Sequence, residues 1–280
     1  MKHSTLILAV ATIILLLNSC GATYSPNCTE GSGNIIIETR DLNKFETMTM
    51  DGWGNVYITI GDVQEVRVET DDDMTDKVST EVRSGVLTID LEESFCPTVL
   101  NIYLTMTEFR AAILNGSGNI ISEEILQKND ISFRSNGSGK IDLGWIYADN
   151  IDVRLDGSGN IEIDSMDADN FNFESYGSGF MNLGFLVGEK ILMKLGGSGS
   201  VGAVGYVDES TITVEGSGYV DFIGLRSRLA GAFALGSGDI KVWAAEKLNV
   251  KISGSGVVIY KGDPEIVQDI SGTGKLIKAE

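Results

Sequence analysis

The tripeptide Gly-Ser-Gly occurs nine times in this chain of 280 residues, and glycine-rich turns are one way in which proteins bind anions. Consecutive backbone N–H groups of such a turn can surround a phosphate. A phosphate loop, however, opens a helix and carries a lysine, whereas the residues after these tripeptides alternate between apolar and polar, as in a β-strand. We therefore interpret the tripeptides as structural turns, in which glycine allows a positive φ and the serine hydroxyl bonds to neighbouring backbone.

Carboxylates at outward positions offer a second kind of chemistry. Asp142, Glu162 and Asp221 occupy equivalent places after three of the tripeptides, and glycan hydrolysis needs two carboxylates that face one groove. A polysaccharide lyase or hydrolase is therefore the alternative to a binding protein. His3 is the only histidine, and the repeats lack the long insertions that usually wall a substrate cleft. We accordingly predict no enzymatic activity and no catalytic residue.

Two acidic segments, residues 71–76 and 164–169, contain oxygen ligands of the type that calcium prefers. Neither segment has the spacing of an EF-hand loop, and the chain lacks the nine-residue repeat of calcium-binding β-rolls. We interpret both segments as solvated loops and predict no cofactor and no metal site. Calcium binding is the alternative.

Three aromatic residues flank the tripeptides at outward positions: Tyr176, Phe180 and Tyr219. Rings on a flat sheet can stack on sugars or contact a protein. These three residues form the predicted ligand surface, and a loosely covered surface without a ligand is the alternative.

The formal net charge is −19, from 40 acidic and 21 basic residues. Such a surface repels nucleic acid and anionic lipid, because phosphate binding requires a basic patch. We therefore exclude nucleic acid as a partner and expect a glycan or an envelope protein. Basic or calcium-bridged partners are also compatible with the charge.

The first residues of the chain indicate its location. A basic start precedes an apolar run, residues 6–17, which is shorter than the roughly 20 residues of a membrane span. The segment Leu17-Asn18-Ser19-Cys20-Gly21 resembles the lipobox of bacterial lipoproteins. The resemblance implies that residues 1–19 are a signal peptide, that Cys20 carries lipid, and that residues 20–34 are an anchor and tether. An ordinary signal peptide with an incidental cysteine is the alternative.

Cys28 and Cys96 are the thiols that remain if Cys20 is lipidated, in a compartment outside the reducing cytosol. They either form one disulfide or stay free, and the local sequence does not decide between the two. We expect the protein in the cell envelope, anchored by lipid at the outer membrane, on either its periplasmic or its outer side.

The spacing of the tripeptides predicts the architecture. In the C-terminal two thirds of the chain they recur every 18 to 21 residues, and a fixed period near 20 is typical of a solenoid. Apolar residues alternate with polar ones on both sides, as with Val153 and Leu155 before Gly157 and Ile161 and Ile163 after it. Three short strands per period predict an all-β fold, a right-handed, three-sided, single-stranded parallel β-helix with about 20 residues per coil.

The third side of each coil carries one large and one small inward residue. We assign Ile146 with Ala148, and Trp243 with Ala245, to these positions. This side is too short for a second large residue to fit inside the coil.

The period is less regular in the N-terminal part. Regular coils are predicted over residues 108–280, and residues 35–107 are predicted to be an irregular β segment of the same solenoid body, capping one end. In that segment, Gly52-Trp53-Gly54 has the pattern of a degenerate corner.

Tandem Gly-Ser-Gly coils behind a lipobox, preceded by a less regular β segment, resemble the putative auto-transporter adhesin, head GIN domain family. The resemblance covers nearly all of the chain after the tether. It implies a parallel β-helix lipoprotein of Bacteroidetes envelopes and carries no catalytic residues over. The expected function is a non-catalytic envelope lipoprotein of adhesin-like or scaffolding type, which binds glycan or protein through flat β-helix faces. Oligomerisation is an expectation from the adhesin analogy alone.

Overall fold

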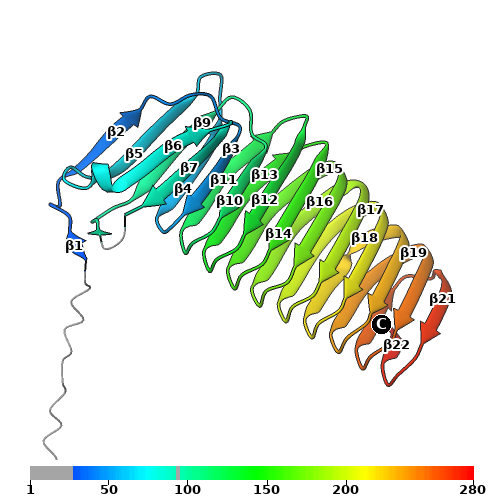
Figure 1. Ribbon diagram of the computed structural model, residues 1–280. Coiled ribbons are helices and arrows are strands. Elements are labelled where there is room, and N and C mark those ends of the chain that lie inside the picture. Colours follow the sequence, from blue (N-terminus) through cyan, green and yellow to red (C-terminus); the bar gives the residue numbers. More distant parts are fainter. Residues whose placement is uncertain (1–27, 93–94) are drawn as a thin grey trace, which may run out of the picture.

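The fold is a β-solenoid in which the chain winds through about eight turns of roughly 20 residues each. Parallel strands of successive turns stack from the N-terminal strands to the C-terminal end (Figure 1). The computed structural model describes residues 28–92 and 95–280, so Cys20 and the predicted signal peptide lie outside the described residues. The structure confirms the predicted all-β parallel β-helix.

Strands make up nearly all of the regular structure. The N-terminal strands are β1 (Thr29–Glu30), β2 (Ile35–Arg40), β3 (Thr47–Asp51), β4 (Asn55–Ile60), β5 (Glu65–Asp71), β6 (Val78–Arg83), β7 (Val86–Leu91), β8 (Phe95–Cys96) and β9 (Asn101–Met106). The coils that follow contain β10 (Ala111–Leu114), β11 (Asn119–Leu126), β12 (Asp130–Ser135), β13 (Lys140–Tyr147), β14 (Asn150–Leu155), β15 (Asn160–Ser175), β16 (Phe180–Leu195), β17 (Ser200–Val214), β18 (Tyr219–Ala234), β19 (Asp239–Ile252), β20 (Val257–Lys261), β21 (Glu265–Ile270) and β22 (Lys275–Lys278).

A short 3-10 helix, η1 (Thr75–Lys77), follows β5. Within residues 28–92 and 95–280, no helix has the length and apolar character needed to cross a membrane.

Each full coil has three flat faces, and the long strand β15 contains all three. Residues 160–163 lie on what we call the first face, residues 165–168 on the second face and residues 170–175 on the third face. The tripeptide forms the corner between the third face and the first face of the next coil. Equivalent residues of the other coils, matched by strand register, are named by the same faces.

Rows of similar side chains fill the bore of the solenoid. The residue two places after a corner tripeptide points inward. Nine residues at this position are at most 1% exposed: Val56, Ile120, Ile141, Ile161, Met181, Val201, Val220, Ile240 and Val258. This is the ladder that the sequence predicts. Because burial of one large aliphatic side chain is worth about 1.5–3 kcal/mol, each such row is a major source of stability.

Backbone hydrogen bonds join each corner to the corner of the preceding coil. The N–H groups of Ser138 and Gly139 donate to the carbonyl oxygen of Gly116 over 3.1 and 3.2 Å, and the same pattern recurs in later coils. A Cβ on Gly137 would overlap that same carbonyl oxygen. The corner glycines are therefore required by the close approach of two backbones.

The predicted reason for the corner glycines, a positive φ, holds at Gly54 and Gly272 but is wrong for the regular coils. From Gly116 to Gly256, a stretch that the structure describes throughout, none of the tripeptide glycines has a positive φ. The corner serines are exposed, and backbone groups rather than serine hydroxyls join the corners. Space, and not backbone conformation, selects glycine here.

The N-terminal strands close one end of the solenoid. β3 and β4 pair in parallel with β10 and β11, so Gly52-Trp53-Gly54 forms a corner, as predicted. β7 and β9 continue the parallel stack beside β3 and β4. Three antiparallel pairs then follow: β6 pairs with β7, β5 pairs with β9, and β2 pairs with β5. The reversal of strand direction ends the parallel stack, and we call these strands the cap (Figure 1).

The second face departs from the predicted register near the C-terminal end. β19 has 14 residues where β18 has 16, and their register shifts between Phe222 and Arg226. As a result Ala244 is buried while Trp243 lies on the outside. The prediction that Trp243 and Ala245 point inward is wrong, because the second face absorbs the two missing residues.

The corner contact gives a stability prediction. Gly157→Ala places a methyl group against the Gly137 carbonyl oxygen, and we expect the free energy of unfolding to fall by about 1–3 kcal/mol, the usual range for overpacking. Urea denaturation followed by circular dichroism measures the change. The exposed neighbour Ser158 provides the control, since Ser158→Ala should stay within about 0.5 kcal/mol of the parent. Equal effects of the two substitutions would contradict the packing argument.

Candidate functional site

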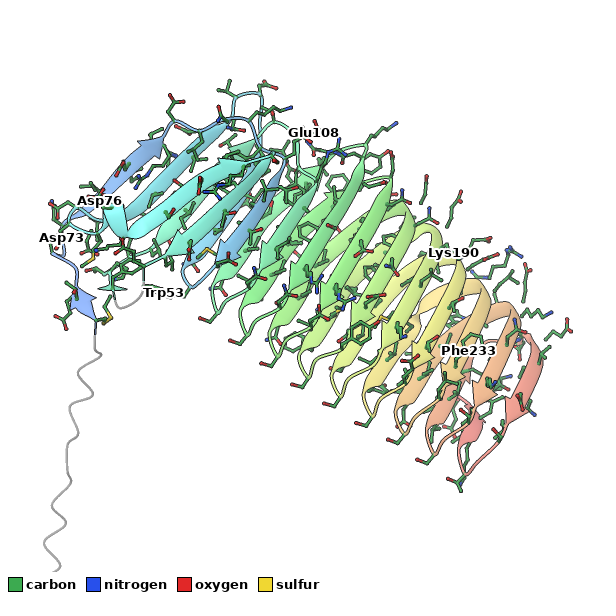
Figure 2. The ribbon with its side chains drawn as sticks, in the orientation of Figure 1. Trp53, Asp73, Asp76, Glu108, Lys190 and Phe233 are labelled. Atoms are coloured by element: carbon green, nitrogen blue, oxygen red, sulfur yellow. A yellow bond between two sulfur atoms is a disulfide. The ribbon has the colours of Figure 1, made fainter. Side chains whose placement is uncertain are left out.

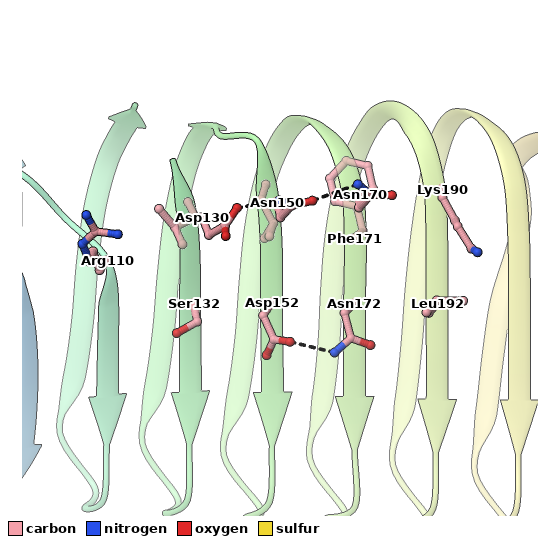
Figure 3. Close-up of a pocket in the computed structure, with 12 residues that line it drawn as sticks. Arg110, Asp130, Ser132, Asn150, Asp152, Asn170, Phe171, Asn172, Lys190 and Leu192 are labelled. Atoms are coloured by element: carbon pink, nitrogen blue, oxygen red, sulfur yellow. Dashed lines mark hydrogen bonds between the residues drawn. The ribbon is translucent and has the colours of Figure 1, made fainter. Parts of the chain in front are cut away.

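A trough crosses the third face over the coils from β12 to β16 (Figure 3). Its volume is about 540 Å³. The residues that line it are Arg110, Asp130, Ile131, Ser132, Asn150, Ile151, Asp152, Asn170, Phe171, Asn172, Lys190 and Leu192. Most of the outward side chains are polar, although the exposed lining itself is more apolar than polar.

Two rows of outward side chains form the trough. The first row is Asp130, Asn150, Asn170 and Lys190, and the second is Ser132, Asp152, Asn172 and Leu192. They point outward because each flanks an inward core residue on its strand. Parallel in-register pairing spaces the members of a row by about 4.8 Å, so each coil contributes one outward side chain to each row.

Hydrogen bonds along the rows hold the amides in place. The Asn170 side-chain amide donates to Asn150 Oδ1 over 2.8 Å, and Asn150 donates in turn to Asp130. In the second row Asn172 donates to Asp152 Oδ2 over 2.7 Å (Figure 3). Each amide has two donors and an acceptor oxygen with two lone pairs, so hydrogen-bonding capacity remains for a ligand.

Cations mark the two ends of the trough. Arg110 donates to Glu46 over 2.8 Å and to Glu108 over 2.7 Å, and the bond to Glu46 is the main reason why the pKa of Arg110 is raised. Lys190 lies at the other end and makes no ion pair with any described residue. The trough can therefore offer donors, acceptors and one free ammonium group.

The predicted aromatic residues do not form one surface. Phe180 and Tyr219 lie on the first face, where they share a hollow of about 340 Å³ with the corner serines. The Tyr219 hydroxyl donates to Asp221 over 2.7 Å, and the Lys241 ammonium lies 5.3 Å from its ring. Burial is the largest of the effects that raise the pKa of Tyr219.

Tyr176 lies on the other side of the corner. Its ring is 39% exposed, with the Arg154 guanidinium 4.8 Å and the Lys194 ammonium 5.9 Å from its centroid. Cations of the same face therefore already lie over this ring.

The carboxylates considered for glycan cleavage are bridged by lysines. Lys140 contacts both Asp142 and Glu162 at 2.9 Å, and these bonds, that to Asp142 first, raise its pKa. Asp221 lies three coils beyond Glu162 and pairs with Lys241 at 3.4 Å. Ion pairs with lysine therefore already engage all three carboxylates.

The first acidic segment holds the N-terminal chain against the cap. Asp71 is fully buried and accepts hydrogen bonds from the Gly33 N–H at 2.6 Å, the Thr98 N–H at 2.6 Å and the Thr98 hydroxyl at 2.9 Å. Asp72 accepts bonds from Ser32 and Asn34. We call these contacts the clasp. The prediction of an exposed loop is wrong for Asp71.

The interpretation of the second acidic segment, residues 164–169, as a loop is wrong, because it runs along the second face as part of β15. Its three aspartates point outward. Among the residues that the structure describes, no group of three or more His, Cys, Asp or Glu is arranged to hold a metal ion.

Cys28 and Cys96 form a disulfide with their Cα atoms 5.7 Å apart. β1 follows Cys28 and pairs with β8, and the Gly31 N–H donates to the Cys96 carbonyl oxygen over 3.1 Å. Residues 28–34 of the predicted tether therefore belong to the cap.

The search for site residues in the sequence missed the trough. Its signal is the recurrence of a polar residue at outward positions of the third face, as with Asp130, Asn150 and Asn170 at intervals of 20 residues. It also missed the exposed rings of the second face, such as Phe185 and Tyr206.

A filled bore, flat faces and a shallow trough define a β-solenoid that presents rows of outward side chains along its faces. The chain belongs to the family described as putative auto-transporter adhesin, head GIN domain, whose model matches residues 44–183 and 154–264. This confirms the resemblance noted in the sequence and places the chain among adhesin-like proteins of the cell envelope or surface.

Solved structures share the fold. A protein of Parabacteroides distasonis ATCC 8503 described as a putative lipid binding protein is 25% identical, with a TM-score of 0.68 over 90% of this chain and 99% of its own. A putative adhesin from Parabacteroides merdae ATCC 43184 has 15% identity and a TM-score of 0.68 over 91% of this chain and 100% of its own. A putative adhesin from Parabacteroides distasonis ATCC 8503 has 21% identity and the same TM-score over 89% and 99%. No curated protein matches the chain in sequence.

The clasp gives a second stability prediction. Asp71→Asn should lower the free energy of unfolding by about 1.5–3 kcal/mol, the range for hydrogen bonds to a charged group, because its amide nitrogen would face donors from Gly33 or Thr98. Urea denaturation and hydrogen exchange of residues 31–34 measure the loss. Asp76→Asn is the control, since Asp76 is exposed and lies outside the clasp. Equal stability of the two variants would refute the role of the clasp.

The same carboxylate predicts a pH dependence. Burial raises the pKa of Asp71, but the bonds from Thr98 and Gly33 together outweigh it, so the pKa lies below its ordinary value of 3.8. Its stabilisation is therefore complete above that value and is lost as the pH falls through the lowered pKa. Asp71→Asn should therefore lose less stability than the parent when the pH is lowered. Unfolding midpoints of the two proteins, measured at neutral and at acidic pH, test this.

Proposed function

We propose that the protein is an adhesin-like glycan-binding module of the cell envelope that binds a polysaccharide along the trough of the third face. The observation that carries the proposal is the pair of in-register rows that begin with Asp130 and Ser132. These rows repeat carboxylate, hydroxyl and amide groups at a constant spacing along the solenoid axis.

The chemistry of the rows suits sugar hydroxyls, which both donate and accept hydrogen bonds. Carboxylates accept, amides do both, and the ladder bonds of Asn150 and Asn170 fix their orientation before a ligand arrives. Preorganised groups lose little entropy on binding. A linear polysaccharide runs along the trough, and successive sugars meet the outward side chains of successive coils.

Charge favours a glycan over a nucleic acid. The chain carries a net charge of −19, and Asp130 and Asp152 lie within the trough. Phosphate groups would be repelled from these carboxylates, whereas sugar hydroxyls are attracted to them. Lys190 adds one site for a carboxylate of an acidic sugar.

Lipid on Cys20 anchors the module in this proposal. The lipobox that ends at Cys20 supports it, as does the position of Cys28 at the cap end of the solenoid. Lys190 of the third face lies farther along the solenoid than the cap, away from an anchor at that end (Figure 2).

Removal of the trough amides should weaken glycan binding. In Asn150→Ala/Asn170→Ala two amides are lost, each worth about 0.5–1.5 kcal/mol, so affinity should fall about tenfold or more. Isothermal titration with a panel of soluble neutral and acidic polysaccharides measures it. Asn249→Ala is the matched control, an exposed asparagine on the same face outside the trough. Unchanged affinity of the double variant, or no binding to any member of the panel, would overturn the proposal.

The anchor has its own test. Cys20→Ala should abolish incorporation of radiolabelled palmitate and release the protein from the membrane fraction, because its thiol is the proposed attachment point. Cys28→Ser/Cys96→Ser is the control for loss of a thiol and should remain labelled. A Cys20→Ala protein that still carries label and sediments with membranes would rule the anchor out.

A further inference from the structure

The second face carries a patch of exposed apolar side chains that the trough does not use. We call it the apolar strip: Trp145, Phe185, Val187, Val204 and Tyr206, each between 41% and 56% exposed. The strip lies outside the core because these residues alternate with buried ones such as Ile146 and Leu186. Contiguous exposed apolar surface of this kind marks interaction sites in soluble proteins.

Strand register makes four of the five residues contiguous, while Ser165 separates Trp145 from Phe185. Phe185 pairs with Val204, and Val187 pairs with Tyr206, in adjacent coils. The rings of Phe185 and Tyr206 meet edge to face, with centroids 6.1 Å apart. Trp145 lies in the row of Phe185, two coils earlier. Trp145 and Val204 are three coil steps of about 4.8 Å apart, so the strip is about 14 Å long. This is the length of about ten residues of an α-helix.

Carboxylates lie along the edges of the strip and, at Asp167, within it. Asp149, Asp169 and Glu189 follow one another along the corner between the second and third faces, where the Asp169 N–H donates to the Asp149 carbonyl oxygen. Asp164 lies at the opposite corner, and Asp167 lies between Tyr147 and Val187 in strand register. We call Asp149, Asp164, Asp167, Asp169 and Glu189 the acidic rim. All five are exposed, and none makes an ion pair with a residue in the described part of the chain.

The second face also has cations at its C-terminal end. Trp243 lies there, with the Lys261 ammonium 4.1 Å and the Arg226 guanidinium 5.9 Å from its ring. Arg226 is also the register neighbour of Tyr206, so a cation follows the strip on that side. The unpaired carboxylates lie on the other side, in the coils that contain β13 to β16. A partner of the strip must therefore be apolar where it meets the rings and basic where it meets these carboxylates.

We propose that the second face binds a cationic amphipathic protein segment, which packs a stripe of apolar side chains on the apolar strip and pairs lysines or arginines with the acidic rim. The rim of unpaired carboxylates is complementary in charge to such a segment. It opposes a second copy of this chain, since two acidic rims would face each other. It equally opposes an anionic lipid surface. The site is on a different face from the trough and does not depend on glycan binding.

The probe for this proposal is a designed Leu/Lys amphipathic helix of about 18 residues, titrated calorimetrically into the protein from residue 21 onward. A peptide of the same composition, permuted so that no apolar face forms, is the control ligand. Phe185→Ser/Tyr206→Ser should weaken binding of the amphipathic peptide about tenfold or more. Phe180→Ser, at a ring on the first face that is 39% exposed, is the protein control and should leave affinity unchanged.

The acidic rim is tested separately. The triple variant Asp167→Asn/Asp169→Asn/Glu189→Gln should bind the peptide about tenfold more weakly at about 50 mM salt. Its affinity should also change less than that of the parent when the salt is raised from about 50 mM to about 300 mM. Thermal unfolding shows whether each variant keeps its fold, which is expected because every substituted side chain is exposed.

Four results would overturn the proposal. They are retained affinity in Phe185→Ser/Tyr206→Ser, equal binding of the permuted peptide, competition by a neutral polysaccharide for the same residues, and self-association in sedimentation equilibrium that the same double substitution abolishes. Asn150→Ala/Asn170→Ala should bind the peptide like the parent, so the outcome is independent of the trough.

Discussion

The close approach of successive corner backbones is the contact on which the rest of the structure depends. The carbonyl oxygen of the first corner glycine accepts N–H groups of the next corner, and the contact leaves no room for a Cβ. It fixes the position of every coil relative to the one before, so inward residues always meet inward residues. A slip by one residue would turn the apolar side chains of a strand towards solvent.

The register that packs the core also builds the surface. A residue type that recurs at an outward position becomes a row along the axis, as with Asn150 and Asn170 in the trough or Phe185 and Val204 on the second face. Hydrogen bonds and ring contacts within a row order its side chains in the absence of a ligand. The solenoid thus produces flat, preorganised surfaces without loops, and each face can carry its own chemistry.

Sequence analysis predicted the core well because alternation and the corner tripeptide recur in every coil. The outer faces were harder to assign, since an outward residue is not constrained by packing. Tyr176 and Phe180 are close in sequence, yet the corner puts them on different faces. Trp243 was misplaced because a coil two residues shorter shifts the register of its second face. The trough depends on side chains on one face of several coils, as Asn150 and Asn170 show, and becomes visible only when that face is assigned.

The distribution of ion pairs distinguishes the faces of a chain whose net charge is −19. On the first face, Lys140 bridges two carboxylates and Lys241 pairs with Asp221, so the local charge is largely balanced. Along the second face, Asp208 in a later coil pairs with Arg228, whereas Asp167 and its corner neighbour Asp169 make no ion pair with a described residue. Their mutual repulsion is small in water but extends over about 8 Å at physiological ionic strength. A basic partner relieves that repulsion as its apolar side chains cover the exposed rings, so charge and apolar contact favour the same occupant.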